Sequence, residues 1–342
     1  MKKQFLDLIL AAKNILVTSH ISPDSDAISS SLLLARGLET NFPSKKVSLV
    51  LEERPTQDLS FLNSYRKIKF QPLDQALTQL KPDLLIMTDA NSYSRCSRQA
   101  GPAVAQYILQ NHLKSIIIDH HEAAGRDKSD LYINNHYPAA TQEVYELLFG
   151  KLRLKKPLGY AQATLLGIVS DTLRFKYTNP KHRETFQLVS ELLDQGEDIE
   201  KLENRLERYS QDQLKVIGHL ATNLTLDHSG YTYSFVSDDF KRQWLKHHRP
   251  QADFKAGCEA FVNRYVRNVN GNNWGFIVYP ELASGDNHYA VSFRALSGTV
   301  DVSIIARSLG GGGHKPAAGV KIRAANVDEA VAITKRAIQL PS

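Results

Sequence analysis

The alternation of short apolar segments with helix-like segments in the first half of the chain is the feature that most constrains its fold. Short apolar runs typical of buried strands occur at residues 14–19, 46–51, 83–87 and 115–118. Apolar residues with helical spacing lie between them, at residues 27–38, 72–80 and 102–110. Strands that are apolar on both faces and separated by helices form parallel sheets with helices on both sides. The sequence therefore predicts an α/β fold with a doubly wound, mainly parallel sheet.

Beyond this region the chain predicts a second, smaller domain. Further helices are expected at residues 140–149, 158–169 and 183–193. Residues 196–220 are strongly charged and carry one apolar stripe, which predicts a helical connector. Hairpin signals follow, one with Ser229-Gly230 at its turn and one with a polar turn at 284–287. We therefore predict a catalytic domain, a connector and a mixed α/β domain, at residues 1–195, 196–220 and 221–342.

Charge and composition narrow the class of partner. The net charge is +6, from 42 Lys and Arg residues interleaved with 36 Asp and Glu residues. Proteins that coat long nucleic acid usually have a concentrated basic stripe, so this pattern favours a small or short anionic ligand. Two cysteines, Cys96 and Cys258, are too few for a disulfide framework. No apolar run approaches the ~18 residues of a membrane helix, and Asp7 interrupts the first apolar segment, so we expect a cytoplasmic protein and no membrane partner.

Acidic residues and histidines follow the predicted strands. They fall in four segments, which contain His20, Asp24 and Asp26; Asp89; Asp119, His120 and His121; and Asp171. The first three segments follow strands, and the fourth ends a predicted helix. Because the carboxyl ends of the strands form the ligand crevice of such sheets, these side chains are expected to converge. Taken alone, Asp26 or Asp89 is equally typical of a helix N-cap. A lone His pair usually reflects packing, and we assign no role to His247-His248.

The joint occurrence of these groups favours a metal centre. Four clustered carboxylates resist shared ionisation, and two divalent cations would balance the charge of Asp24, Asp26, Asp89 and Asp171. Mixed imidazole and carboxylate ligands suit Mn²⁺, Fe²⁺, Co²⁺ or Zn²⁺ better than Ca²⁺. The set has no thiolate, which argues against a structural zinc site. Two ions about 3.5–4 Å apart are a common arrangement for phosphoryl chemistry.

One motif stands out in the second domain, where four glycines precede His314 and Lys315. Glycines let backbone N–H groups approach an anion closely, so we expect a shaped phosphate-binding loop. A flexible turn is the ordinary alternative. Arg294 ends a predicted strand, and its planar fork suits a phosphate, although a single arginine is more often a surface residue.

The motifs together resemble the DHH phosphoesterase superfamily, in order and spacing along the whole chain. The glycine-His segment resembles the DHH-associated C-terminal domain. The most similar group is the oligoribonuclease (nanoRNase)/pAp-phosphatase group. The resemblance implies hydrolysis of short oligoribonucleotides such as pApA to mononucleotides, and of pAp to AMP, by a two-metal mechanism. It also implies Mn²⁺ as the metal, adenine nucleotides among the ligands, and a homodimer.

The resemblance also assigns roles to residues. His20 and Asp24 correspond to ligands of one metal and Asp26, His120 and Asp171 to ligands of the other, with Asp89 bridging both. His121 corresponds to the group beside the substrate phosphate, and Asp119 to the residue that orients the histidine pair. The substrate-holding set comprises Arg294, Gly311, Gly312, Gly313 and His314. The chain departs from the family at three positions where glycine is common, Ser25, Ser29 and Leu173.

Four other functions stay open at this point. A cyclic-di-AMP phosphodiesterase shares the motifs. A RecJ-like single-strand exonuclease is disfavoured because the chain has no basic stripe. A metal-dependent pyrophosphatase shares the N-terminal motifs but not the glycine-His segment. A nucleotide-binding regulator on an inactive scaffold is disfavoured because every expected ligand position carries a suitable residue.

Overall fold

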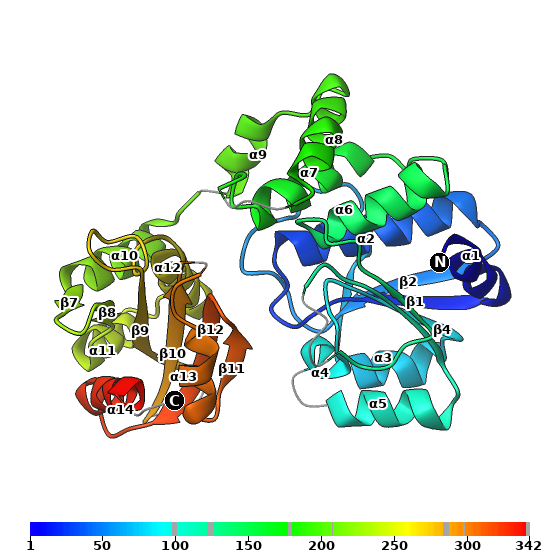
Figure 1. Cartoon of the computed structure of the whole chain (residues 1–342). Coiled ribbons are helices and arrows are strands. Elements are labelled where there is room, and N and C mark those ends of the chain that lie inside the picture. The colour runs from blue at the N-terminus through cyan, green and yellow to red at the C-terminus, as the bar shows by residue number, and fades with distance from the viewer. Residues whose placement is uncertain are drawn as a thin grey trace. The chain divides into compact units, whose positions relative to one another are not determined.

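The protein consists of two compact units, Met1–Glu207 and Arg208–Ser342 (Figure 1). The computed structural model describes residues 1–97, 101–121, 126–176, 180–206, 208–282, 287–296 and 298–339, without the side chain of His314. The segment predicted as a connector contains two helices. The first, α9 (Ile199–Leu206), belongs to the first unit, and the second, α10 (Gln211–Thr222), to the second.

The first unit contains the predicted parallel sheet. Its six strands pair in parallel in the order β3-β2-β1-β4-β5-β6. Their bounds are β1 (Asn14–Thr18), β2 (Lys46–Leu51), β3 (Lys69–Phe70), β4 (Leu84–Thr88), β5 (Lys114–Ile118) and β6 (Leu131–Ile133). This order, with its reversal between β1 and β4, is that of a doubly wound sheet. The predicted fold class is therefore confirmed.

Helices cover both faces of this sheet because successive strand residues point to opposite sides. Ile15, Ile86 and Ile116 pack against the first group of helices. That group contains α1 (Lys2–Ala11), α2 (Ser25–Asn41), α6 (Ala140–Tyr145), a π-helical turn (Glu146–Lys151), α7 (Tyr160–Asp171) and α8 (His182–Asp194). Leu16 and Ile117 pack on the opposite face. The elements there are α3 (Leu73–Leu80), α4 (Tyr93–Cys96) and α5 (Gly101–Gln110) (Figure 1). A 3₁₀ turn, Tyr65–Lys67, precedes β3.

The second unit has a mixed sheet of six strands in the order β11-β12-β10-β9-β8-β7. Their bounds are β7 (Thr225–Asp227), β8 (Tyr231–Phe235), β9 (Trp274–Pro280), β10 (His288–Ala295), β11 (Gly312–His314) and β12 (Ala317–Arg323). Among the described strands of this second sheet, only β8 and β9 pair in parallel. The predicted hairpin at Ser229-Gly230 is confirmed, since β7 and β8 pair antiparallel. Strands β9 and β10 also pair antiparallel, but residues 284–286 of their predicted turn lie outside the described residues.

The prediction of a loop over the glycine motif is wrong for its central residues, 312–314. Residues Gly312–His314 form the edge strand β11, in which Gly312 pairs with Gly319 and Gly313 with Ala318. Glycine is disfavoured in strands, so the sequence pattern did not indicate a strand here.

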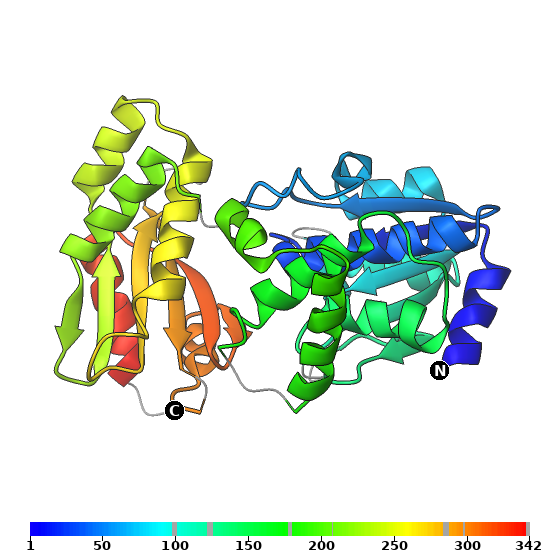
Figure 2. The ribbon, with the colours of Figure 1, turned by 90° about the horizontal axis from the view of Figure 1, so that it is seen from above.

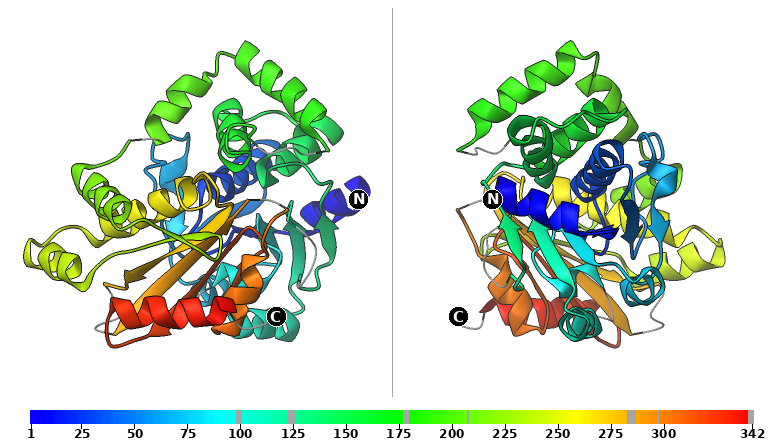
Figure 3. Two further views of the ribbon diagram at one scale, coloured as in Figure 1. Left: turned by 60° about the vertical axis from the view of Figure 1, so that its left-hand side comes forward. Right: turned by 90° about the vertical axis from the view of Figure 1, so that its right-hand side faces the viewer.

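Helices also lie on both faces of the second sheet. Ile277 packs towards α10, α11 (Asp238–Lys246) and α12 (Gln251–Arg264). Phe276 and Val278 pack towards α13 (Val302–Ser308) and α14 (Val327–Gln339). Figures 2 and 3 show α12, in yellow, and α14, in red, on opposite sides of these strands. Cys96 and Cys258 are both buried and free. Within the described residues, no helix combines the length and apolar character needed to span a membrane.

Candidate metal centre

The sheet of the first unit brings the predicted segments to one edge. The strand order reverses between β1 and β4, and ligand sites of such sheets lie at this point, beyond the carboxyl ends of the strands. His20 follows β1, Asp89 follows β4, and Asp119 follows β5 beside it. The topology therefore places the three segments next to one another, as the sequence predicted.

Two aspartates at the start of α2 have different roles. Asp24 is the N-cap of the helix, and its Oδ1 accepts a hydrogen bond from the Ala27 amide at 3.0 Å. Asp26, in the first turn, is 1% exposed and accepts bonds from the amides of Ala140 and Thr141 at 2.6 and 2.9 Å. These amides belong to the start of α6, and a helix N-terminus favours an anion. The alternative that Asp26 caps α2 is therefore excluded.

Asp89 lies at the centre of the cluster. Its Oδ2 is 3.3 Å from Nε2 of His20, and its Oδ1 is 3.4 Å from Nε2 of His120. The side chain is buried, and the backbone has a left-handed φ of 54°. Among non-glycine residues, Asp and Asn tolerate this conformation best, so the turn after β4 also suits this residue type. One carboxylate thus faces both histidines, as a bridging ligand would.

His120 connects the remaining carboxylates. Its Nε2 is 3.3 Å from Oδ2 of Asp171, the last residue of α7, and 3.9 Å from Oδ2 of Asp26. Among the described residues, three groups have potential ligand atoms within 4.8 Å of one another. They are His20, Asp24 and Asp89; Asp26, His120 and Asp171; and Asp89, Asp119, His120 and His121. The first two groups coincide with the two ligand sets that the family resemblance implies.

The donor atoms of this cluster fit divalent cations. Asp89 Oδ1, Asp119 Oδ2 and His120 Nε2 are buried and have no hydrogen-bond partner within the described part of the chain. Such atoms destabilise a fold by about 1–3 kcal/mol each unless something else satisfies them. Carboxylate oxygens and imidazole nitrogens are ligands for first-row divalent metals, and no thiolate belongs to the set.

The pKa values of the cluster indicate that it carries excess negative charge. Burial lowers the pKa of His20, but Asp89 and Asp24 outweigh it and raise the pKa to about 9. Burial and the neighbouring Asp89 raise the pKa of Asp26 to about 7. Burial also raises the pKa of Asp171 well above its usual range. The groups therefore retain protons to offset the excess negative charge, a task that bound cations would take over.

Asp119 holds the histidine pair in place. Its Oδ1 accepts a bond from the His120 amide at 2.9 Å and lies 2.8 Å from Nδ1 of His121. Burial raises the pKa of Asp119, but the bond to His121 outweighs it and lowers the pKa below its usual range. A carboxylate against Nδ1 places the ring proton there, which fixes the imidazole tautomer.

The three positions where the family commonly has glycine differ in environment. Ser25 donates its hydroxyl to Oε1 of Gln57 at 2.9 Å, and Ser29 is buried. Leu173 has a φ of 47°, in the left-handed region that glycine adopts without strain. The backbone therefore accounts for a glycine preference at this position, although the chain has leucine.

Gly167 packs directly against the candidate site, and sequence reasoning missed this position. A Cβ atom on this residue of α7 would collide with Oγ1 of Thr141 and lie 2.7 Å from Oδ1 of Asp26. Thr141 Oγ1 in turn hydrogen bonds to that same carboxylate. The missing side chain therefore lets α7 approach α2 and α6 where Asp26 is held. A glycine inside a helical segment, four residues before Asp171, was the available signal.

Two of the predicted substrate residues share one backbone row of the second sheet. Arg294 in β10 and His314 in β11 both pair with Ala317 of β12. Nε of Arg294 donates to Oδ1 of Asn263 at 2.7 Å, and its Nη1 donates to the Phe293 carbonyl at 2.8 Å. The side chain of His314 lies outside the structural description. Gly311, Gly312 and Gly313 precede it, and a Cβ on Gly311 or Gly313 would collide with β12.

Comparison with known families matches both units. The family described as DHH family, N-terminal domain, matches residues 14–168, and the DHHA1 domain matches residues 259–340.

Known proteins resemble the chain over most of its length. It is 29% identical to the bifunctional oligoribonuclease and PAP phosphatase NrnA of Mycoplasma pneumoniae, over 92% of this chain and 89% of that protein. It is 25% identical to the cyclic-di-AMP phosphodiesterase GdpP of Geobacillus thermodenitrificans, over 97% of this chain but 48% of that protein. The crystal structure of an exopolyphosphatase-related protein from Bacteroides fragilis has the same fold. It superposes with a TM-score of 0.81 at 22% identity and covers 99% of this chain and 95% of that one.

Proposed function

Because the chain belongs to the DHH family, with a DHH domain followed by a DHHA1 domain, we propose that it is a metal-dependent phosphoesterase that hydrolyses short oligoribonucleotides to mononucleotides. We also propose that it converts pAp to AMP. The observation that carries the proposal is the position of Asp89 between His20 and His120, with a carboxylate-rich set on either side. The similarity to a bifunctional oligoribonuclease and PAP phosphatase supports the choice of substrates.

The proposed metal sites divide the cluster into two sets that share Asp89. His20 and Asp24 would hold one divalent ion, and Asp26, His120 and Asp171 the other. When bound, the ions supply positive charge that activates water at neutral pH and offsets charge developing on the phosphoryl oxygens. We propose Mn²⁺, because mixed imidazole and carboxylate ligands suit it and the family resemblance implies it.

His121 is the proposed proton donor to the leaving oxygen. Its Nδ1 lies 2.8 Å from Asp119, and its side chain is 24% exposed, whereas Asp119 is fully buried. A ring held at one nitrogen and partly open to solvent can present its other nitrogen to a substrate phosphate. Asp119 would then act as the positioning residue.

The second unit would hold the nucleotide portion of the substrate. Arg294 lies in the strand row that contains the backbone of His314, and glycines precede His314 in β11. Burial lowers the pKa of Arg294, which nevertheless stays charged at neutral pH, so an anion would stabilise this guanidinium. Arg294, Gly311, Gly312, Gly313 and His314 therefore remain the proposed substrate-binding set.

Hydrolysis of cyclic di-AMP is the second candidate activity. It is favoured by the similarity to a cyclic-di-AMP phosphodiesterase, which extends over 97% of this chain. The same metal chemistry would serve both substrates, so the two activities differ in how the nucleotide is held.

A substrate panel with Mn²⁺ tests these proposals. Initial rates would be compared for pAp, pApA, cyclic di-AMP and RNA of two to about ten nucleotides, with products resolved over time. We expect pApA and other short RNAs to give mononucleotides, and pAp to give AMP. Rapid turnover of cyclic di-AMP with slow turnover of pApA would favour the second candidate. Absence of turnover with all of them would contradict the phosphoesterase proposal.

The proposal includes a homodimer, which rests on the family resemblance alone. It also includes a cytoplasmic location, which two buried, free cysteines fit because thiols stay reduced there. Analytical ultracentrifugation of the full chain tests the oligomeric state, and fractionation of cells tests the location.

A further inference from the structure

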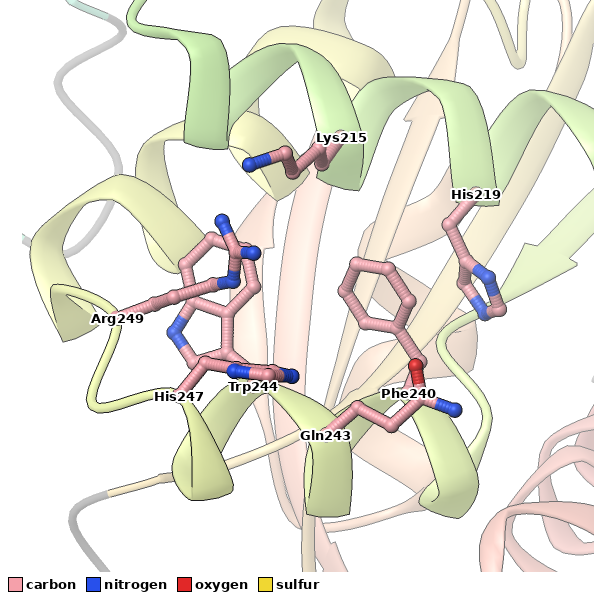
Figure 4. A pocket seen from close by; sticks show the side chains of 7 residues that line it. All are labelled: Lys215, His219, Phe240, Gln243, Trp244, His247 and Arg249. Carbon is pink, nitrogen blue, oxygen red and sulfur yellow. The ribbon is translucent and has the colours of Figure 1, made fainter.

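The second unit contains a pocket that the proposed chemistry does not use. It lies between α10 and α11, has a volume of about 370 Å³, and is lined by Lys215, His219, Phe240, Gln243, Trp244, His247 and Arg249 (Figure 4). Pockets for small ligands typically start at about 300 Å³. The lining combines basic side chains with aromatic rings, which differs from the carboxylate-rich set around Asp89.

The pocket is separate from the proposed substrate residues of the same unit. Its helices pack on the Ile277 face of the sheet, and α11 directly follows β8. The glycine motif lies in β11, at the other edge. Four strand spacings separate β8 from β11 in the sheet order, or roughly 20 Å at about 4.8 Å each. Arg294 lies closer, in β10, two strand spacings from β8, but its Nε bonds to Asn263 of α12, and the pocket lining contains no residue of that helix. The pocket is therefore distinct from the set proposed around Arg294.

Two cations meet at one side of the pocket. Nζ of Lys215 is 2.9 Å from Oδ1 of Asp212, and Arg249 pairs with the same oxygen atom. A single carboxylate offsets one of the two positive charges, so a net charge of about +1 remains. An ammonium has three N–H donors and a guanidinium has five, so both groups keep donors for a further anion. Asp212 thereby holds two cationic side chains side by side.

Aromatic rings form another part of the lining. The rings of His219 and Phe240 are stacked, with centroids 4.2 Å apart and an interplanar angle of 24°. The Asn223 side chain and the Ser237 amide both donate to Nε2 of His219, at 3.0 and 3.1 Å, so Nδ1 carries its proton. Burial lowers the pKa of His219, which keeps the ring neutral and suitable for stacking.

Trp244 adds a buried polar atom to this surface. The residue is 2% exposed, and its Nε1 has no hydrogen-bond partner within the described residues. Buried indole nitrogens usually find an acceptor, so this donor indicates an incomplete environment. His247 also lines the pocket, although its sequence context gave it no role.

We propose that this pocket binds a nucleoside monophosphate, with its base against the aromatic rings and its phosphate at Lys215 and Arg249. Stacking of a base on an aromatic side chain contributes about 1–3 kcal/mol, and the paired cations would add charge-assisted hydrogen bonds. The choice of a nucleotide among aromatic anions rests on the proposed function, whose products are nucleoside monophosphates. The pocket is thus a second nucleotide site, separate from catalysis.

Calorimetric titration of the full chain with AMP, in EDTA, tests this site. We expect saturable binding, with adenosine and inorganic phosphate each binding at least about tenfold more weakly. The double variant Lys215→Gln/Arg249→Gln should weaken AMP binding at least tenfold, and Phe240→Leu should weaken AMP without affecting phosphate. The matched control is Lys246→Gln/Arg242→Gln, which removes two exposed cations of α11 that do not line the pocket and should leave binding unchanged.

Two further measurements separate this proposal from the proposed function. Arg294→Gln should retain AMP binding in the pocket, and Lys215→Gln/Arg249→Gln should hydrolyse pApA with Mn²⁺ at a rate within about twofold of the wild type. AMP binding lost in Arg294→Gln but kept in the pocket variant would overturn the second site. Equal affinity for AMP and phosphate would also overturn it, as would no binding at millimolar AMP. A chain that binds AMP in the pocket but hydrolyses no substrate would refute only the proposed function.

Discussion

At the scale of single residues, Asp89 determines how the two proposed metal sets are joined. Its two oxygens face different histidines, at 3.3 Å and 3.4 Å, and no other carboxylate among the described residues lies within 3.5 Å of both His20 and His120. The left-handed backbone after β4 directs this side chain into the cluster. Asp89 therefore supplies both the negative charge and the central position that the two proposed metal sets share.

Asp89→Asn should abolish activity while keeping the fold. Asparagine tolerates the left-handed φ of 54° and matches aspartate in size, but it removes the shared negative charge. We expect the rate to fall at least ~10³-fold, and bound metal to fall from two ions towards one or none. Rate assays and metal analysis of the purified protein measure both. Asp328→Asn, at an exposed position of α14, is the control and should change neither. Near-normal turnover with two bound ions would refute the bridging role.

Gly167→Ala should disturb Asp26 without touching any proposed ligand. The new methyl group would collide with Thr141 and lie 2.7 Å from Asp26 Oδ1, so α7 must shift. Overpacking of this kind costs about 1–3 kcal/mol, and we expect that loss in the free energy of unfolding together with weaker metal binding. Gly218→Ala in α10 is the control, because nothing lies within 4 Å of its Cβ position. At that position alanine should increase the free energy of unfolding by up to about 1 kcal/mol, because alanine favours a helix more than glycine does. Equal effects of the two variants would contradict the packing argument.

At the scale of elements, the sequence predicted the parts of the molecule that follow a clear period. The four predicted strands of the first sheet lie within one residue of β1, β2, β4 and β5. Their apolar runs mark strands buried on both faces, and this burial is a property that a single sequence displays. The convergence of the acidic and histidine side chains was predictable for a related reason, because parallel strands end at one edge of the sheet.

The elements that the sequence did not reveal depend on partners distant in the chain. Strands β3 and β6 have only two and three residues and form by pairing with β2 and β5. Strand β11 consists largely of glycine and exists through its pairing with β12. The pocket between α10 and α11 likewise arises from tertiary packing. Local propensity carries no information about such contacts.

Gly311→Ala should weaken the edge of the second sheet. A Cβ atom there would lie 2.5 Å from Cβ of Val320 and collide with the backbone at Gly319, so β11 must move away from β12. We expect a loss of about 1–3 kcal/mol in the free energy of unfolding, with metal content unchanged. Gly312→Ala is the matched control, since its Cβ position has open space and should cost much less. Thermal unfolding and metal analysis distinguish the two variants. Equal destabilisation by the two variants would contradict the argument that Gly311 is tightly packed and Gly312 is not.

At the scale of the whole molecule, the metal-free protein should lose stability as pH rises. His20 has a folded-state pKa of about 9, above its usual 6.5, so its stabilising contribution is complete below pH 6.5 and disappears as pH passes 9. Across this pH range the free energy of unfolding should fall by about 3 kcal/mol at most through His20. Asp26, with a pKa of about 7, has already lost its contribution by pH 7, since a raised carboxyl pKa also destabilises as pH rises.

Bound Mn²⁺ should oppose this loss of stability at high pH. Cations bind the deprotonated side chains, so the affinity of the site for Mn²⁺ rises with pH. The gap in melting temperature between the Mn²⁺-loaded and EDTA-treated protein should therefore widen between pH 6.5 and 9.5. Thermal unfolding at fixed ionic strength measures it. His20→Asn should flatten the dependence in EDTA, whereas His228→Asn in the second unit should not. A gap that narrows with pH would contradict the assignment of His20 as a metal ligand.

Substrate length is also a property of the whole molecule. An enzyme for long strands needs a continuous basic groove with aromatic stacking faces, because each neutralised phosphate adds affinity and salt dependence. Here 42 basic residues are interleaved with 36 acidic ones, and the proposed substrate set is confined to Arg294 and the row at β11. Further nucleotides should add little affinity while they lose conformational freedom on binding.

We therefore expect RNAs of two to about five nucleotides to be hydrolysed faster than long single strands. The measurement is the initial rate against chain length at fixed salt with Mn²⁺, repeated at a second salt concentration. For short substrates the logarithm of kcat/KM should fall with a slope of about −1 to −2 against the logarithm of salt concentration, since few phosphates are neutralised. Arg294→Gln should reduce the rate for nucleotide substrates more than for an activated aryl phosphodiester, which needs fewer contacts. Rates that climb steadily to twenty nucleotides, with a correspondingly steep salt dependence, would instead indicate an exonuclease for long strands.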